Sequence, residues 1–166
     1  MLGFLYAQPD HGYSLHQKLA SEFSYVWHVR QSQTYNILKR LETQGFISST
    51  TQEQEKLPPR QMLQITEQGR RRFEEWLHAP SGSSVRSIRL EFITRLYFAQ
   101  KLFPELAPII IQGEAADIDT ALVKLEKSLK CADPEQVFNR LGLELRIQQP
   151  HSVKDWLNEC RKAFEI

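Results

Sequence analysis

Cysteine is scarce in this 166-residue chain, which has only Cys131 and Cys160. Two cysteines are too few for a disulfide framework, and neither has a CxxC partner or a histidine at metal-ligand spacing. The five histidines are also scattered, so we expect no metal site. Such cysteine usage is typical of a reducing compartment, and we expect a cytoplasmic protein.

Long hydrophobic runs are also missing. No apolar stretch approaches the roughly 20 residues that a helix needs to cross a bilayer. The short apolar stretch at residues 1–7 has no basic residues before it, which favours a core helix over a signal peptide. The chain has no GxSxG elbow, phosphate-binding loop or HExxH helix. We therefore expect no membrane partner, no enzymatic activity and no cofactor.

Neither half of the chain carries an excess of one charge. Residues 1–80 hold nine basic and eight acidic residues, and residues 81–166 hold twelve of each. A protein that binds nucleic acid mainly through charge has a strong basic excess. Any binding to DNA must then depend on a local basic patch. The same balance favours an alternative class of protein, an adapter that binds other proteins.

A run of small residues divides the chain in two. Residues 79–84 read Ala-Pro-Ser-Gly-Ser-Ser, which cannot continue a helix and has little to bury. We expect one domain over residues 1–79, a linker over residues 80–84 and a second domain over residues 85–166. The chain is long enough to bury a substantial core.

The first domain is expected to combine helices with a short hairpin. Apolar spacing and the stops at Pro9 and Gly45 predict helices over about residues 1–8, 13–23 and 31–44. Residues 46–51 and 62–65 favour two strands on either side of a proline-containing loop. Thr66 is a good cap for a further helix that ends near His78. A helix, a turn, a second helix and a two-stranded β-wing make a winged helix-turn-helix.

The helix over residues 31–44 has two faces of different character. Thr34, Ile37, Leu38 and Leu41 form a stripe that must be buried. The other face mixes cations with amide and hydroxyl groups, which can read base edges or hold phosphate oxygens. Ordinary solvated residues would look the same. The candidate DNA-binding residues, including two from the wing, are Ser32, Gln33, Tyr35, Asn36, Lys39, Arg40, Lys56 and Arg60.

Two parts of the first domain have competing interpretations. The hydroxyl of Tyr35 can bond a phosphate, or its ring can be half-buried in the core. The element His11-Gly12-Tyr13 opens a helix, and free backbone N–H groups at such an end attract phosphate. For this element we favour a structural role, in which Gly12 gives a turn and Tyr13 packs.

The second domain is expected to be helical throughout. Apolar residues recur at spacings of three and four over residues 85–103, 111–129 and 138–145, and again from Val153 to Phe164. The spacing over residues 111–129 alternates strictly between four and three, as in a coiled-coil seam. Pro134 is expected to open a helix, and Pro150 to break or kink it.

Apolar stripes this wide bury poorly in a lone helical unit of this size. We therefore predict a dimer. The residues predicted to make the dimer contacts are Phe92, Leu96, Phe103, Ile111, Ile118, Leu122, Leu125, Leu129 and Trp156.

A family resemblance rests on motifs that cover most of the first half. They are, in chain order, His11-Gly12-Tyr13, Tyr35, Leu38-Lys39-Arg40-Leu41-Glu42, Gly45-Phe46-Ile47, Pro59-Arg60, Ile65-Thr66-Glu67-Gln68-Gly69-Arg70 and Glu75-Trp76-Leu77. With these motifs the chain resembles the PadR family of bacterial transcriptional regulators. Residues 23–27, 31–33 and 90–96, with a tryptophan near the end, resemble the virulence-activator subgroup of that family.

The resemblance implies a winged helix, a helical dimerisation domain and a homodimer bound to double-stranded DNA. Many relatives have a glycine before the tyrosine and a proline after it, where this chain has Ser32, Gln33 and Asn36. The docking mode is therefore expected to transfer, but not the base preference. The family sometimes uses an aromatic cavity for a small effector, which makes Trp27 and Trp156 candidates for such a pocket. Core or interface packing is the alternative for both tryptophans.

Together these patterns indicate a mostly α protein with an amino-terminal winged helix and an all-α dimerisation domain. We interpret it as a cytoplasmic transcriptional regulator that binds a pseudo-palindromic operator as a homodimer. A small aromatic effector or a second regulator would act by shifting the separation of the two recognition helices. The alternative is a winged-helix protein–protein adapter without DNA binding.

Overall fold

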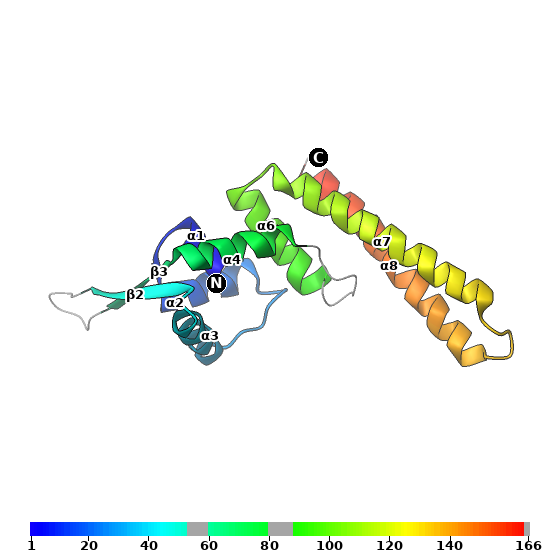
Figure 1. Ribbon diagram of the computed structural model, residues 1–166, viewed down its shortest axis with the longest axis horizontal. Helices are drawn as coiled ribbons and strands as arrows, with labels where there is room; N and C mark the ends of the chain where they lie inside the picture. The colour runs from blue at the N-terminus through cyan, green and yellow to red at the C-terminus, as the bar shows by residue number, and fades with distance from the viewer. Residues whose placement is uncertain (53–59, 80–87, 165–166) are drawn as a thin grey trace. The chain divides into compact units, whose positions relative to one another are not determined.

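The computed structural model describes residues 1–52, 60–79 and 88–164. The chain separates into two compact units, Met1–Ala79 (unit 1) and Pro80–Ile166 (unit 2). Figure 1 shows the helices and strands of the two units. Helices dominate both units and a small sheet lies in unit 1, so the expected fold class is confirmed. Lys56 and the predicted linker over residues 80–84 lie outside the described residues.

Unit 1 holds four helices: α1 (Leu2–Ala7), α2 (Gly12–Glu22), α3 (Gln31–Thr43) and α4 (Glu67–His78). Each lies within two residues of its predicted range. The predicted stripe of α3 is confirmed in part, because Thr34 and Leu38 are buried, whereas Ile37 and Leu41 are half-buried. The other core residues of unit 1 are mostly large apolar side chains, namely Phe4, Leu5, Leu15, Phe23, Ile47, Leu63, Phe73 and Leu77.

The sheet of unit 1 has three strands, where the sequence predicted two. β2 (Ile47–Gln52) and β3 (Arg60–Ile65) form the expected antiparallel hairpin. A third strand, β1 (Asp10–His11), pairs with the other side of β3 in the order β1-β3-β2. The prediction missed β1 because two residues next to Pro9 carry no alternating pattern. β1 joins the start of α2 to the wing.

Asp10 holds β1 against the first turns of α2. Its buried carboxylate accepts hydrogen bonds from the His11 N–H and the Ser14 hydroxyl, each at 2.8 Å. Lys18 Nζ lies 2.7 Å from the same carboxylate. Burial raises the pKa of Asp10, but the contacts with Lys18, Ser14 and His11 outweigh it, so the pKa lies below its usual value. The charged carboxylate therefore fixes where α2 begins.

The start of α4 packs directly on the turn that follows α3. Thr66 caps α4 as predicted, because its hydroxyl oxygen accepts a hydrogen bond from the Gly69 N–H at 3.1 Å. The same hydroxyl donates to the Gly45 carbonyl at 2.7 Å. Gly69 leaves no room for a side chain, since an added Cβ would lie 2.0 Å from the Phe46 carbonyl oxygen. This close approach locks α4 to the chain between α3 and β2.

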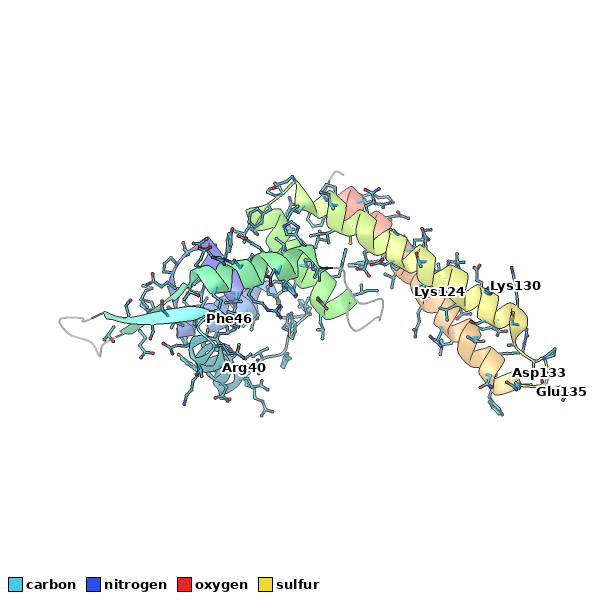
Figure 2. The ribbon with its side chains drawn as sticks, in the orientation of Figure 1. Arg40, Phe46, Lys124, Lys130, Asp133 and Glu135 are labelled. Carbon is cyan, nitrogen blue, oxygen red and sulfur yellow. The ribbon has the colours of Figure 1, made fainter. Side chains whose placement is uncertain are left out.

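Unit 2 is helical throughout its described part, as predicted. A π-helical turn, η1 (Ile88–Phe92), leads into α6 (Ile93–Leu102). Two long helices follow, α7 (Leu106–Cys131) and α8 (Val137–Ala163). They lie side by side as a helical hairpin (Figure 1). Figure 2 shows Lys124 and Lys130 on α7, with Asp133 and Glu135 in the turn between the two helices.

One proline prediction for unit 2 is wrong and the other is wrong in part. Pro134 does not open a helix, because it lies in the turn before α8, which begins at Val137. Pro150 does not break the helix, because it lies inside the continuous α8, and a kink at Pro150 stays a prediction. Proline in a helix interior costs roughly 3 kcal/mol. Ile147, Val153 and Leu157 pack on the core around this position, and we attribute the continuity of α8 to that packing.

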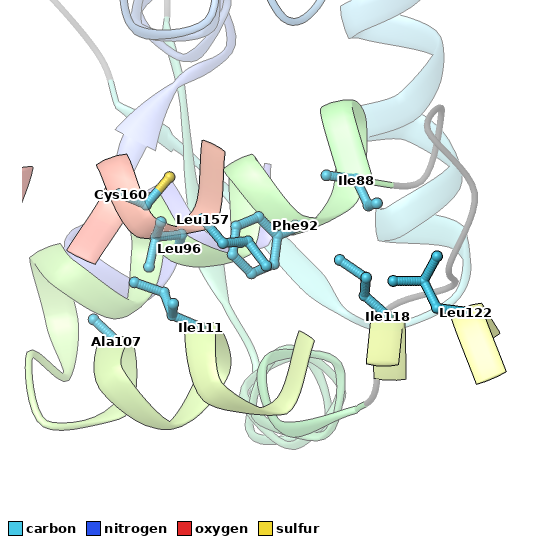
Figure 3. Packing of buried hydrophobic residues seen from close by; sticks show 9 residues of the cluster. All are labelled: Ile88, Phe92, Leu96, Ala107, Ile111, Ile118, Leu122, Leu157 and Cys160. Atoms are coloured by element: carbon cyan, nitrogen blue, oxygen red, sulfur yellow. The ribbon is translucent and has the colours of Figure 1, made fainter. Parts of the chain in front are cut away.

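The core of unit 2 is made by α7 and its neighbours in the same chain. Figure 3 shows nine buried side chains that converge from η1, α6, α7 and α8. They are Ile88, Phe92, Leu96, Ala107, Ile111, Ile118, Leu122, Leu157 and Cys160. The coiled-coil spacing of α7 therefore reflects packing against helices of the same chain.

More than half of the residues predicted to make dimer contacts belong to this core. Five of those residues are at most 6% exposed, so a second chain cannot reach them in the folded unit; they are Phe92, Leu96, Ile111, Ile118 and Leu122. Phe103, Leu125 and Leu129 are half-buried, and Trp156 is 37% exposed. The expectation that these stripes need another chain is therefore wrong for the five buried residues. Their own chain covers them.

The described elements of unit 2 leave a different apolar face of this unit uncovered. Val137, Phe138, Leu141 and Leu145 of α8 are all more than half exposed, and Phe138 is 88% exposed. Their spacing of three and four puts them on one side of the helix. Gly142 lies among them, and a Cβ built on it would have no atom within 4 Å. We call these five residues the α8 stripe.

One buried charge cluster is also part of unit 2. Arg95 on α6 is 2% exposed and lies 3.0 Å from the Glu91 carboxylate. Burial lowers the pKa of the Arg95 guanidinium, while Glu91 and the buried Glu114 counter that effect. Apolar periodicity could not reveal this cluster, because Glu114 lies in a helix whose inward face looks uniformly apolar.

Candidate nucleic-acid interface

The polar face of α3 is exposed along its whole length. The six α3 residues predicted to contact DNA are all exposed in the structure: Ser32, Gln33, Tyr35, Asn36, Lys39 and Arg40. Figure 2 labels Arg40 on this helix. The buried stripe of Thr34 and Leu38 fixes the rotation of α3 and so decides which residues point outward. α3 therefore presents amide, hydroxyl and cationic groups to solvent.

A groove of about 760 Å³ brings part of this face together with α2 and the wing. From α3 it is lined by Tyr35, Asn36, Lys39 and Glu42. Leu38 of α3 also lines it. The other lining residues come from β1, α2 and β3, and they are His11, Gly12, Tyr13, Ser14, Gln61 and Leu63. Ser32, Gln33 and Arg40 are not among the lining residues. The α3 face thus divides into a groove side and a free side.

Gly12 determines how closely α2 approaches α3 beside this groove. A Cβ at Gly12 would lie 2.9 Å from Tyr35 Cε1 and 3.3 Å from Leu38 Cδ1. Any side chain there would push the Tyr35 ring aside. The structural role expected for Gly12 is thus supported, although the cause is the close approach to Tyr35. A second contact between the helices runs from His16 Nδ1 to Thr34 Oγ1 at 2.9 Å.

Tyr13, His11 and Gln61 line the groove in ways that the sequence did not predict. Tyr13 was expected to pack, but it is 56% exposed and its hydroxyl accepts a hydrogen bond from Gln17 Nε2 at 2.8 Å. His11 was expected to have a structural role at the start of α2, and nothing in the sequence indicated Gln61. They are adjacent because β1 pairs with β3, with His11 Nδ1 lying 3.0 Å from the Gln61 carbonyl oxygen. Prediction of β1 would have revealed them.

Glu42 gives the groove one anionic wall. Its carboxylate accepts a hydrogen bond from the Ser49 hydroxyl of β2. This contact ties the end of α3 to the wing and directs the carboxylate toward β2. Lys39, one turn earlier, is the α3 cation that lines the groove. The groove is therefore lined by a cation, two tyrosine rings and a restrained carboxylate.

The wing candidates are less completely described. Arg60 is the first residue of β3 and its backbone pairs with Gln52, whereas its side chain lies outside the described part of the structure. The contact of Arg60 with DNA stays a prediction, as does that of Lys56.

The two tryptophans of the predicted effector pocket belong to different units. Trp27 lies in the connection between α2 and α3 of unit 1 and is 36% exposed. Trp156 lies on α8 of unit 2, with its ring edge-on to Phe92 at a centroid distance of 5.8 Å. Trp156 also lines a cavity of about 540 Å³ with Tyr97, Lys101 and Phe164. The effector pocket stays a prediction.

No helix within the described ranges combines the length and apolar composition needed to cross a bilayer. Nor does that part of the chain gather three or more His, Cys, Asp or Glu side chains that could hold a metal ion.

Comparisons with known proteins find similarity to transcriptional regulators. Residues 1–75 match the model of the transcriptional regulator PadR-like family. The negative transcriptional regulator PadR of Bacillus subtilis is 27% identical over 140 residues, which is 81% of this chain and 75% of that protein.

Solved structures of transcriptional regulators are also similar to this chain, at lower sequence identity. The crystal structure of Bacillus subtilis PadR in complex with operator DNA is 24% identical and has a TM-score of 0.46, over 96% of this chain and 92% of that one. The Vibrio cholerae virulence activator AphA is 19% identical with a TM-score of 0.42, over 95% and 91% of the two chains. The match to the PadR-like family model thus covers most of unit 1, the unit that holds α3 and the groove.

Proposed function

We propose that this chain is a sequence-specific DNA-binding regulator that docks α3 in the major groove. One observation carries the proposal: in a chain whose first 75 residues match a regulator family, Tyr35, Asn36 and Lys39 share a groove with α2 and β3. Helix-turn-helix proteins insert their second helix into the major groove of DNA, with its first residues near the bases. Tyr35 and Lys39 would hold phosphates, and Asn36 would contact a base edge.

The test is a fluorescence anisotropy titration with DNA from upstream of the gene for this chain, at several salt concentrations. We expect sequence preference and an affinity that falls as salt rises, because bound phosphates release counterions. Since the chain is nearly neutral, with a net charge of +1, binding should be lost at moderate salt. No binding even at low salt would favour the protein–protein adapter instead.

Lys39→Ala and Asn36→Ala should separate two kinds of contact. Loss of the Lys39 phosphate contact is expected to weaken binding to all sequences and to reduce the salt slope by about 0.9. Loss of an Asn36 base contact is expected to cost about 1–3 kcal/mol on the preferred site and much less on random DNA.

Arg71→Ala is the matched control for the loss of a cation. Arg71 lies on α4, is exposed and pairs with Glu67, and it does not line the groove. Its replacement should leave the salt slope unchanged. Equal losses on both DNAs for Asn36→Ala would place the wrong face of α3 in the major groove.

We further propose that the chain acts as a homodimer and reads two half-sites of a pseudo-palindrome. The support is the α8 stripe, four large apolar side chains that this chain leaves exposed. Exposed apolar patches of this kind mark interfaces. A second copy is the occupant that makes two recognition helices available to one symmetric operator. The open space at Gly142 would let the two helices approach closely.

Phe138→Asp tests the dimer proposal. A carboxylate at this 88% exposed position should leave the monomer folded, yet it would be buried without a partner in the dimer. We expect light scattering to show a monomer whose circular dichroism is unchanged. Asn139→Asp adds the same charge at the next residue and should remain dimeric. A dimeric Phe138→Asp variant would exclude the α8 stripe as the contact.

The virulence-activator subgroup stays a proposal that rests on the sequence motifs of residues 23–27, 31–33 and 90–96. An aromatic effector that acts through Trp27 or Trp156 is likewise a proposal. A cytoplasmic location follows from the proposed function, since an operator-binding protein must reach DNA.

A further inference from the structure

The side-chain amide of Gln33 has a fixed orientation at the start of α3. The backbone N–H of Arg30 donates a hydrogen bond to Gln33 Oε1 at 2.9 Å. Because a backbone N–H can only donate, the side-chain atom that faces it must be the amide oxygen and not the nitrogen. Among the residues that the structure describes, Gln33 Nε2 makes no hydrogen bond. Two N–H donors of an exposed side chain are therefore left for another molecule.

This orientation is maintained by the needs of the helix end. Arg30 is the N-cap of α3, and Gln33 is the third helical residue. The first N–H groups of a helix have no partner within it, and a Glu or Gln at the third position is the side chain that reaches back to the N-cap N–H. Arg30 has only donors in its side chain, so it cannot return the bond. Gln33 thus provides the side-chain acceptor at this end.

Gln33 is also placed where base edges are read. It lies in the first turn of α3, the part of a recognition helix that enters the major groove. It is exposed and does not line the groove that contains Tyr35 and Lys39. Asn36, one turn later, is exposed next to it on the helix surface.

The chemistry of the free donors favours one base. Glutamine usually reads adenine with both amide atoms, since the oxygen accepts from N6 and the nitrogen donates to N7. In Gln33 the oxygen already accepts from the Arg30 N–H, so only one lone pair remains for such a contact. Guanine presents two acceptors in the major groove, N7 and O6, and requires only donors, whereas adenine presents only N7 and thymine only O4. Cytosine presents an amino donor, which the Nε2 group of Gln33 cannot accept.

We propose that Gln33 is a specificity-determining residue that caps α3 with its oxygen and reads guanine with its nitrogen. The inference rests on the proposed function, because it requires α3 to enter the major groove. It adds the base that one position of each half-site should contain. It also assigns to one side chain two separable tasks, so a substitution can remove one of them and keep the other.

The test is selection of binding sites from a pool of random double-stranded DNA by the full-length chain and its variants. The parent should enrich guanine at one position of each half-site, about tenfold over adenine. Gln33→Glu keeps an acceptor for the Arg30 N–H, so its melting temperature should not fall. It replaces the donors by a carboxylate, which accepts from cytosine N4. Cytosine should therefore replace guanine at that position.

Two further variants control for charge and for the cap. Gln31→Glu adds the same charge at an exposed position of the same helical turn, so it should weaken binding to all sequences without changing the preferred base. Gln33→Ala removes both tasks, so it should lower the melting temperature and leave that position without a preference. If Gln33→Glu binds too weakly for selection, the loss of the guanine preference in Gln33→Ala decides the question.

Three results would overturn the inference. Enrichment of adenine at the position that responds to Gln33 would mean that the amide leaves the cap and reads with both atoms. An unchanged preference in both Gln33 variants would place Gln33 against a phosphate or in solvent. In both cases the parent still binds specific DNA, so the proposed function stands. A parent that binds no DNA at low salt would overturn the proposed function and this inference together.

Discussion

Gly69→Ala is expected to destabilise unit 1 by about 3 kcal/mol or more, near the upper end of what overpacking costs. The added methyl group would lie 2.0 Å from the Phe46 carbonyl oxygen and 2.8 Å from Ile65 Cγ1. A backbone carbonyl cannot rotate away as a side chain can. α4 must then move off the turn after α3, and the Thr66 contact with the Gly45 carbonyl is lost with it.

Thermal unfolding followed by circular dichroism, with amide NMR spectra to identify unit 1, would measure this effect. Gly113→Ala on α7 is the matched control. A Cβ at Gly113 has no atom within 4 Å, so alanine there should stabilise the helix by about 0.5–1 kcal/mol. A Gly69→Ala variant as stable as the parent would mean that α4 lies farther from Phe46 than the structure places it.

Leu122→Asp is expected to unfold unit 2. Leu122 is 6% exposed and packs in the core shown in Figure 3. A carboxylate there would be buried without a partner, and its side chain would leave part of the Leu122 volume empty. Together these effects cost several kcal/mol, which is a large part of the stability of a small domain. Helical circular dichroism should fall, while the NMR signals of unit 1 should keep their dispersion.

Val123→Asp is the control on the adjacent residue. Val123 is 66% exposed, so the same carboxylate would stay in water and should change stability by less than about 0.5 kcal/mol. A folded Leu122→Asp unit that has lost only its dimer would return Leu122 to the interface that the sequence predicted. The comparison with Phe138→Asp, which is expected to stay folded, separates a core position from a surface one.

The sequence predicted α3 and its faces well, because a helix that packs on one side must repeat its apolar residues every three or four positions. The same rule explains why the seam of α7 was assigned to another chain. Its spacing identifies a face that packs on a helix, but it carries no information about which helix covers that face. Here η1, α6 and α8 of the same chain do so. The α8 stripe is exposed, although its members Leu141 and Leu145 follow the same periodicity.

The candidate site was predictable on α3 and poorly predictable elsewhere. Exposure of Asn36 and Lys39 follows directly from burial of Thr34 and Leu38. The contribution of His11 and Gln61 depends on strand pairing between distant segments, which local patterns do not encode. The amide orientation of Gln33 depends on one hydrogen bond at a helix end. Capping-box sequences predict that bond only when a serine or threonine precedes them, and here Arg30 does.

The pairing of β1 with β3 has a consequence for how unit 1 folds. His11 and Gln61, which meet in this pairing, are 50 residues apart in the chain. Contacts between distant segments form late, because closing a long loop must come before any gain from the contact. α2 and α3, by contrast, are neighbours in sequence and can associate early. A newly made chain should therefore acquire its helix-turn-helix before the three-stranded sheet is closed, and the groove between them should be completed last.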